Sequence, residues 1–172
     1  MTPKVDEDFL ALPLDACADA ALAVAESLGA EHVEVRITGS LSSRMRLKDA
    51  RLQGSRLSED FGIAVRVIVD GCWGFAAHDD VSVESASRVA ARAVEMARVS
   101  APLVTPRLVL APEPVHVGTW VSSYDVDPFL VPDTEKAGVL AERSSAVLAH
   151  PGVSHVFAEL HAAKERRHFV TS

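Results

Sequence analysis

Histidine is the residue type through which this sequence could most readily bind a metal or move a proton. A zinc-peptidase helix places a glutamate directly beside a metal-binding histidine, where it activates water. The seven histidines are His32, His78, His116, His150, His155, His161 and His168. The residues that follow them are, in the same order, Val, Asp, Val, Pro, Val, Ala and Phe. No histidine precedes a glutamate, so the sequence contains no such helix, and we single out no catalytic residue in it.

One row of residues could still ligate a metal. In a strand predicted at 153–163, the two-residue period places His155, Glu159 and His161 on one face. The opposite face has the apolar pattern of a core, with Val156, Ala158 and Leu160. We interpret the histidines as solvated or interface residues and predict no metal site, and a weak alternative is a metal held by this row with His168.

Three residues of the central segment could contact another molecule. Arg66 lies in a predicted strand, where a partly buried guanidinium needs an acidic partner, and Glu34 or Asp60 could supply it. A structural ion pair is the favoured interpretation of Arg66, and contact with a peptide carboxylate or a partner subunit is the alternative. Trp73 and Phe75 are interpreted as core aromatics or, alternatively, as part of an interface.

The composition is that of a folded, acidic chain. It is 48% apolar, with a net charge of −7 and an isoelectric point near 5.4. Acidic chains repel phosphate backbones, so we expect no direct contact with nucleic acid. Cys17 and Cys72 lie in apolar patterns and are expected to be buried, reduced thiols. The acidic N-terminus is unlike a signal peptide, and no window approaches the about 18 apolar residues of a membrane span, so we expect a cytoplasmic protein without membrane contact.

Hydrophobic periodicity predicts the helices and strands. Small apolar residues recur at helical spacing from Leu14 to Leu28, and alternation on both sides of Asp70-Gly71 predicts a β-hairpin at 61–77. Ser82 is expected to cap a second helix. The other expected elements are strands at 32–38, 42–48 and 51–58, the helix at 82–99, a helix from its cap Asp133 to Ala149, and strands at 153–163 and 165–171 joined by a turn near Lys164.

A proline-rich stretch divides the chain. Six of the nine prolines lie between Ala101 and Pro132, and proline removes backbone donors and favours extended conformations. We predict a long strap at 101–132 with a short strand at 115–121. The fold class is predicted to be α+β, with antiparallel β-hairpin sheets and helices packed on one face. Helix–strand–strand order at both ends suggests two small subdomains, 1–100 and 133–172, joined by the strap.

One block of this sequence resembles a known family. Residues 62–76 read Gly-Ile-Ala-Val-Arg-Val-Ile-Val-Asp-Gly-Cys-Trp-Gly-Phe-Ala, similar to the TldD/PmbA pattern of a strand with a central Arg, a turn, and Trp-Gly-Phe-Ala. Residues 31–36 after an Ala-rich helix, and 78–82 before another, resemble the surroundings of that pattern. Residues 166–172 resemble the stretch that leads to the family's Asn-Ser-x-Gly junction. The resemblance spans nearly the whole chain, and Arg66 with the aromatic-Gly-Phe-Ala run is closer to TldD than to PmbA/TldE.

The resemblance implies an N-terminal, non-catalytic domain of a zinc metallopeptidase that degrades or processes unfolded peptides. The family's zinc lies in a C-terminal domain, on a His-Glu-x-x-x-His helix with a later Cys ligand, so no cofactor is expected in this chain. The implied partners are that C-terminal domain, a TldD/TldE-type subunit and unfolded peptide. Residues 1–172 would then form one N-terminal domain that is inactive alone, and would contribute the chamber wall and the subunit-pairing surface.

Two other functions stay open at this stage. The chain could be a stand-alone regulatory module that binds a peptide or a protein without hydrolysing it. The family is also labelled modulator of DNA gyrase, which suggests a regulator that touches gyrase or DNA. The net charge of −7 argues against contact with DNA.

Overall fold

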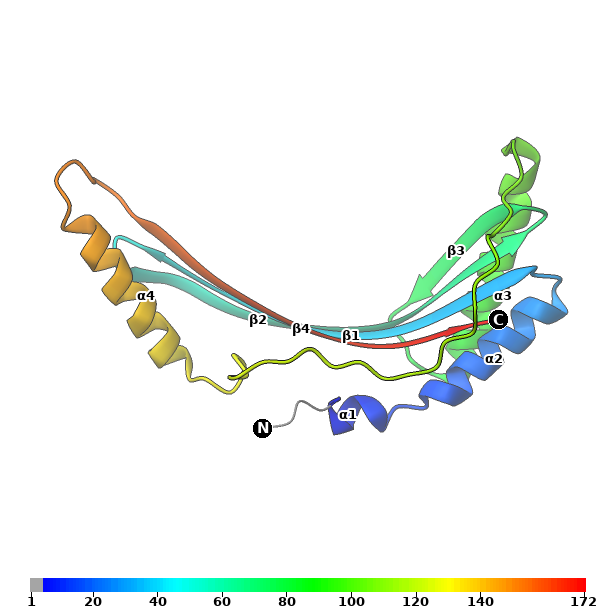
Figure 1. Cartoon of the computed structure of the whole chain (residues 1–172), viewed down its shortest axis with the longest axis horizontal. Coiled ribbons are helices and arrows are strands. Elements are labelled where there is room, and N and C mark those ends of the chain that lie inside the picture. The colour runs from blue at the N-terminus through cyan, green and yellow to red at the C-terminus, as the bar shows by residue number, and fades with distance from the viewer. Residues whose placement is uncertain (1–4) are drawn as a thin grey trace. The chain divides into compact units, whose positions relative to one another are not determined.

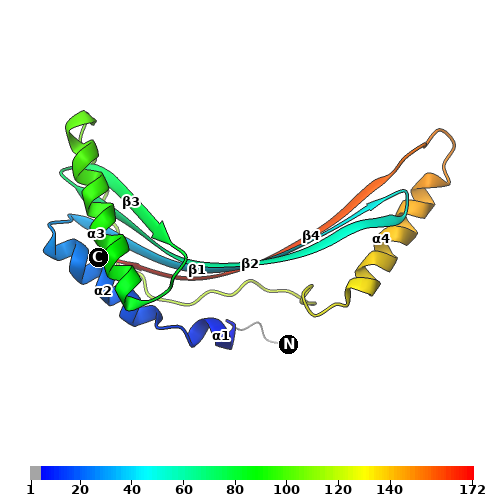
Figure 2. The ribbon, with the colours of Figure 1, turned by 180° about the vertical axis from the view of Figure 1, so that it is seen from behind.

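A computed structural model describes residues 5–172 (Figures 1 and 2). The strands form one sheet in the order β3-β2-β1-β4, and helices pack on it, which confirms the predicted antiparallel α+β class. The described part of the chain contains no helix long and apolar enough to cross a membrane. The elements are α1 (Glu7–Leu10), α2 (Leu14–Ser27), β1 (His32–Lys48), β2 (Arg51–Val69), β3 (Cys72–His78), α3 (Val83–Ser100), the 3-10 turn η1 (Ala101–Leu103), α4 (Asp133–Leu148) and β4 (Phe157–Thr171).

The chain forms two compact units, and each is discontinuous in sequence. The larger unit comprises residues 5–39, 60–121 and 166–172, and the smaller unit comprises residues 40–59 and 122–165. β1, β2 and β4 are long strands, and each contributes one end to each unit. For this reason the units do not coincide with the sequential blocks 1–100 and 133–172.

The larger unit has a core of small and β-branched side chains. The inward-facing strand residues alternate with polar ones, as expected for a sheet with one covered face. Figures 1 and 2 show α2 and α3 side by side against the strands of this unit. The buried residues include Val33, Val35, Ile37, Ile63, Val65 and Val67 from the strands, and Cys17, Ala18, Ala21, Ala25, Ala86, Ala90, Ala93 and Ala97 from the helices.

Alanine on the inner faces of both helices lets their backbones approach the sheet closely, and the closest approach is at Gly74 of β3. A Cβ atom at Gly74 would lie 2.0 Å from the carbonyl oxygen of Ala93 and 2.7 Å from the Cβ of Ala97. The neighbouring atoms are mainly helix backbone, which cannot rotate away as a side chain could. The residue at position 74 must therefore lack a side chain.

The predicted turn and cap are confirmed. Asp70 and Gly71 have φ of 51° and 67°, as a two-residue hairpin turn requires, and Val69 pairs with Cys72 across it. The hydroxyl of Ser82 accepts a hydrogen bond from the backbone N–H of Ser85, and α3 begins at the next residue after the cap. The predicted helix at 14–28 corresponds to α2.

Three predicted strand breaks are wrong, because the structure has single long strands there. The stretches 32–38 and 42–48 join in β1, and 51–58 joins the hairpin strand in β2. The turn predicted near Lys164 is also absent, and β4 runs unbroken from Phe157 to Thr171. Lys164 points inward, where its ammonium binds a carboxylate oxygen of Asp127 at 2.8 Å. A charged residue at an inward position interrupts the apolar pattern without interrupting the strand.

Two further details differ from the prediction. No strand forms at 115–121, and residues 104–132 have no helix or strand. Asp133 is the first residue of α4, and Pro132 occupies the cap position. The carboxylate of Asp133 instead binds the hydroxyl of Ser55 at 3.1 Å and the ammonium of Lys136 at 3.1 Å. Asp133 therefore ties α4 to β2 within the smaller unit.

Replacing Gly74 with alanine should destabilise the protein by about 2–3 kcal/mol, because the added methyl group overlaps the backbone of α3. The measurement is urea unfolding followed by far-ultraviolet circular dichroism. The matched control is Gly54→Ala, also in a strand, where an added Cβ meets nothing within 4 Å. The control should stay within about 0.5 kcal/mol of the wild type, and equal losses in both variants would contradict the packing argument.

Candidate functional site

The helices of the larger unit cover one face of its strands and leave the other face partly open. Side chains on this second face alternate with the core residues along each strand. We call this surface the open face, and its residues are Glu34, Arg36, Arg66, Trp73, Phe75 and Phe169. The three residues for which contact with another molecule was the alternative interpretation, Arg66, Trp73 and Phe75, all belong to it.

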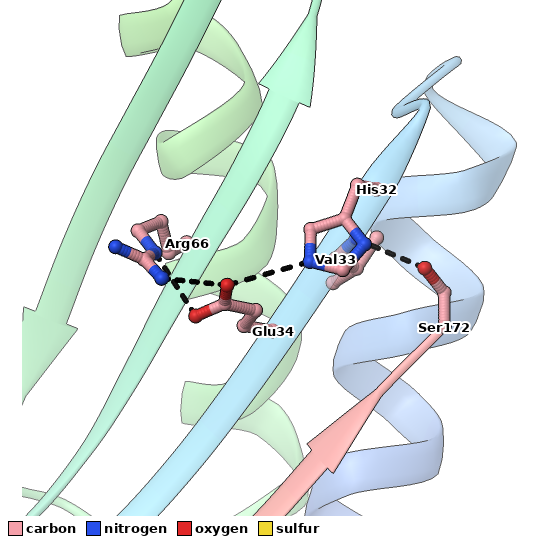
Figure 3. A network of polar contacts seen from close by, with 5 residues as sticks. All are labelled: His32, Val33, Glu34, Arg66 and Ser172. Carbon is pink, nitrogen blue, oxygen red and sulfur yellow. Dashed lines mark hydrogen bonds and ion pairs between the residues drawn. The ribbon is translucent and has the colours of Figure 1, made fainter. Parts of the chain in front are cut away.

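An ion pair organises the centre of the open face (Figure 3). Arg66 on β2 donates two hydrogen bonds to the carboxylate of Glu34 on β1, from Nε at 2.9 Å and from Nη2 at 2.6 Å. The guanidinium also lies over the ring of Trp73, 4.3 Å from its centroid. His32 places Nε2 3.4 Å from the same carboxylate. Of the two acidic partners considered for Arg66, the structure places Glu34 on it.

The carboxylate of Glu34 is largely buried, with its side chain 11% exposed, whereas Arg66 is 46% exposed. Burial raises the pKa of Glu34, but the hydrogen bonds and the charge of Arg66 outweigh burial, so this pKa lies below its ordinary value of 4.5. A carboxyl with a depressed pKa stabilises the fold above its unfolded pKa. That stabilisation is lost as the pH falls through the folded pKa.

Aromatic side chains extend the open face on both sides of the ion pair. Phe75 pairs with Arg66 across β2 and β3, and its side chain is 59% exposed, so it does not lie in the core. Phe169 on β4 is 48% exposed, and the guanidinium of Arg36 lies 5.3 Å from its ring centroid. Arginine stacked on exposed aromatics is typical of protein interfaces. The open face can therefore hold apolar and acidic groups of another chain.

The row considered for a metal is engaged elsewhere. His155 precedes β4, and its Nδ1 lies 3.0 Å from the carboxylate of Asp49. Glu159 pairs with Arg44 and Arg46, and His161 points to the exposed side of β4. Within residues 5–172, no group of three or more His, Cys, Asp or Glu residues is placed to hold a metal ion.

The smaller unit contains two polar depressions that the sequence patterns did not single out. One, of about 550 Å³, contains Lys136 with its partner Asp133, and its apolar wall includes Leu57 and Phe129. The other, of about 580 Å³, is lined by Arg44, Arg46, Arg56, His161 and neutral polar residues. The sequence signal for the second was two arginines at i and i+2 in β1. A third arginine comes from the neighbouring strand β2, so the cluster becomes visible only once the strand order is known.

Comparison with known proteins identifies relatives of the chain by sequence pattern and by fold. Residues 33–97 match the family model described as PmbA/TldA metallopeptidase domain 1. No curated protein sequence matches the chain. The matched segment contains β1 except its first residue, all of β2 and β3, and most of α3, and thus most of the open face.

Three solved structures with the same fold come from different organisms. TldE from Thermococcus kodakarensis has a TM-score of 0.63 and 18% identity, over 91% of this chain and 35% of that chain. A candidate modulator of DNA gyrase from Bacteroides thetaiotaomicron has a TM-score of 0.68 and 15% identity, over 91% of this chain and 36% of that chain. A candidate modulator of DNA gyrase from Thermotoga maritima has a TM-score of 0.63 and 14% identity, over 92% of this chain and 36% of that chain. The chain thus spans about a third of the length of these relatives, and at these identities the likeness is one of fold.

Replacing Glu34 with glutamine should lower the free energy of unfolding by about 1 kcal/mol at pH 7, because it removes a hydrogen-bonded charge pair whose arginine is half exposed. Because the pKa of Glu34 is depressed, the deficit should shrink as the pH falls below 4.5 and through the folded pKa of Glu34. Urea unfolding at pH 7, 5 and 3 measures this.

The control is Glu84→Gln in α3. Glu84 is also 2.6 Å from an arginine, Arg88, but its side chain is 83% exposed. This variant should change stability little at any pH, because exposed pairs are screened by solvent. A pH-independent deficit in Glu34→Gln would show that packing, and not the ion pair, holds this part of the face.

Proposed function

We propose that this chain, whose residues 33–97 match the model of PmbA/TldA metallopeptidase domain 1, is the N-terminal, non-catalytic domain of a zinc metallopeptidase of unfolded peptides. In this proposal, the domain forms part of a chamber wall and a surface on which two subunits pair. The zinc and the catalytic residues belong to a C-terminal domain of the full-length protein, as the resemblance implies.

The observation that carries the pairing role is a set of exposed apolar side chains in the larger unit. Between residues 109 and 120, the side chains of Val109, Val115, Val117 and Trp120 are 88%, 93%, 97% and 83% exposed. We call residues 109–120 the apolar strap. Four large apolar side chains exposed on one short segment would suit an interface, and a partner that covered them would remove their area from water, at about 25 cal/mol per Å².

The backbone of the apolar strap is suited to an interface. Pro112 and Pro114 fix two φ angles and cannot donate hydrogen bonds, so this segment has fewer conformations to lose on binding. The residues between them and around them have no helix or strand of their own. An extended segment that is already restricted by prolines costs less entropy to order against a partner than a flexible loop of the same length.

The open face supports the chamber-wall role. Its exposed arginines and aromatics offer charge and apolar contact to an unfolded chain without requiring one sequence. The ion pair between Arg66 and Glu34 holds the centre of this face in place, so the wall keeps its shape while peptides differ.

A second candidate function uses the same surfaces without catalysis. The apolar strap and the open face would equally serve a stand-alone module that binds a peptide or a protein partner. The two proposals differ in what the gene encodes. We expect the parent reading frame to continue past Ser172 and to encode a His-Glu-x-x-x-His helix, and a frame that stops at Ser172 would favour the binding module.

The paired substitution Val117→Glu with Trp120→Glu should weaken subunit pairing at least about tenfold, because two buried carboxylates without partners are costly at an interface. The measurement is sedimentation velocity of the full-length protein, mixed with a TldE-type subunit from the same organism, over a range of concentrations.

The matched control for pairing is Leu10→Glu, which places a charge on another exposed apolar residue of the larger unit, 58% exposed in α1. The control should pair like the wild type. Equal pairing by wild type and by the strap variant would remove the apolar strap from the interface, and with it the observation on which the pairing role rests.

A further inference from the structure

A cluster of basic side chains lies in the smaller unit, apart from the open face and the apolar strap. Arg44 and Arg46 on β1, Arg56 on β2 and His161 on β4 line a depression of about 580 Å³. The other lining residues are neutral, and Glu159, which is not among them, pairs with Arg44 and Arg46. This concentration of positive charge occurs in a chain whose net charge is −7, so it is a local feature and not a consequence of composition.

The arginines form an array with the spacing of an extended chain. Arg44 and Arg46 are two residues apart in β1, so their side chains project from the same face at a separation of roughly 7 Å along the strand. Arg56 extends the array on the adjacent strand. Every second side chain of an extended polypeptide is also roughly 7 Å from the next, so acidic residues in alternate positions would meet successive guanidinium groups.

The cluster already binds one carboxylate, and it binds it loosely. An oxygen of Glu159 lies 3.4 Å from Nε of Arg44, and the other oxygen lies 3.7 Å from Nε of Arg46. The Arg66–Glu34 pair, in contrast, has two hydrogen bonds of 2.6 and 2.9 Å. The side chains of Arg44, Arg46 and Glu159 are 52%, 65% and 44% exposed. One exposed carboxylate is thus shared between two guanidinium groups, and a better-placed carboxylate can displace it.

We propose that this depression binds a carboxylate-rich, extended segment of an acidic polypeptide, with Arg44, Arg46 and Arg56 as its ligands and Glu159 as an internal competitor. Guanidinium groups match carboxylates in geometry and can bind them through two parallel hydrogen bonds. The hydroxyls of Ser42 and Ser58 also line the depression and can serve the backbone or side chains of the bound segment.

Nucleic acid fits this depression less well than an acidic polypeptide does. Proteins that bind single strands combine basic grooves with aromatic side chains on which bases stack, and none of the described lining residues is Phe, Tyr or Trp. The net charge of −7 also opposes the approach of a long phosphate backbone. A short acidic segment has a lower charge density and meets only the local basic surface.

The test uses a fluorescein-labelled decapeptide of alternating glutamate and threonine, with anisotropy read at 20 and 150 mM salt. The peptide should bind this chain more weakly at the higher salt concentration, and the same peptide with glutamine in place of glutamate should not bind. Replacing Arg44, Arg46 and Arg56 together with glutamine should reduce affinity at least tenfold. The matched control replaces three exposed helical arginines, Arg88, Arg92 and Arg143, and changes the net charge equally.

The competitor provides a second and opposite test. Glu159→Gln should bind the glutamate peptide more tightly, by about threefold, because an exposed ion pair that competes with the ligand is removed. If Glu159 only holds the strands together, this variant would instead unfold at lower urea concentration with unchanged affinity. That result would overturn the proposal, and so would an absence of peptide binding at 20 mM salt. An equal loss of peptide affinity in the control variant, or tighter binding of a ten-residue oligothymidine than of the glutamate peptide, would also overturn it.

Discussion

The close contact between the backbone of α3 and the glycine of β3 is the constraint on which the larger unit depends. A helix can approach a strand this closely only where both surfaces lack bulk, and here Gly74 meets Ala93 and Ala97. The same small residues let α2 pack beside α3 on one face of the strands. With the helices on that face, the remaining face must be compatible with water or with a partner, and it carries ion pairs and arginine–aromatic contacts.

The parts of the fold that follow from local chemistry could be predicted from the sequence. Asp70-Gly71 specifies a tight turn because both residues must adopt positive φ, and the alternating residues around it fix which face is buried. The strand lengths could not be predicted in the same way. β4 continues through Lys164 because that ammonium is bound by Asp127, from a segment distant in sequence. A charged residue whose partner is far along the chain looks, in sequence alone, like the end of a strand.

The candidate sites show the same division between local and distant information. Arg66 could be predicted to need an acid, and the choice between Glu34 and Asp60 required knowing that β1 lies beside β2 in this register. For Phe75 the sequence favoured the core and left an interface open, and its exposure of 59% shows that it does not lie in the core. The arginine cluster of the smaller unit comes from separate strands, so no single stretch of sequence displays it.

Burial distinguishes the two carboxylate–guanidinium arrangements of this chain, because a sheltered pair stabilises the fold and an exposed pair can exchange its partner. Glu34 is sheltered and bound through two short hydrogen bonds, so displacing Arg66 from it would leave a charge without a partner away from water. Glu159 is open to solvent and held at longer distances by two arginines, so its release costs little. Under the functions proposed above, the chain has to keep its own shape and also bind other chains, and each demand calls for a different kind of pair. Because the two pairs belong to different units, the proposed ligand exchange at Glu159 would leave the pair of Glu34 and Arg66 intact.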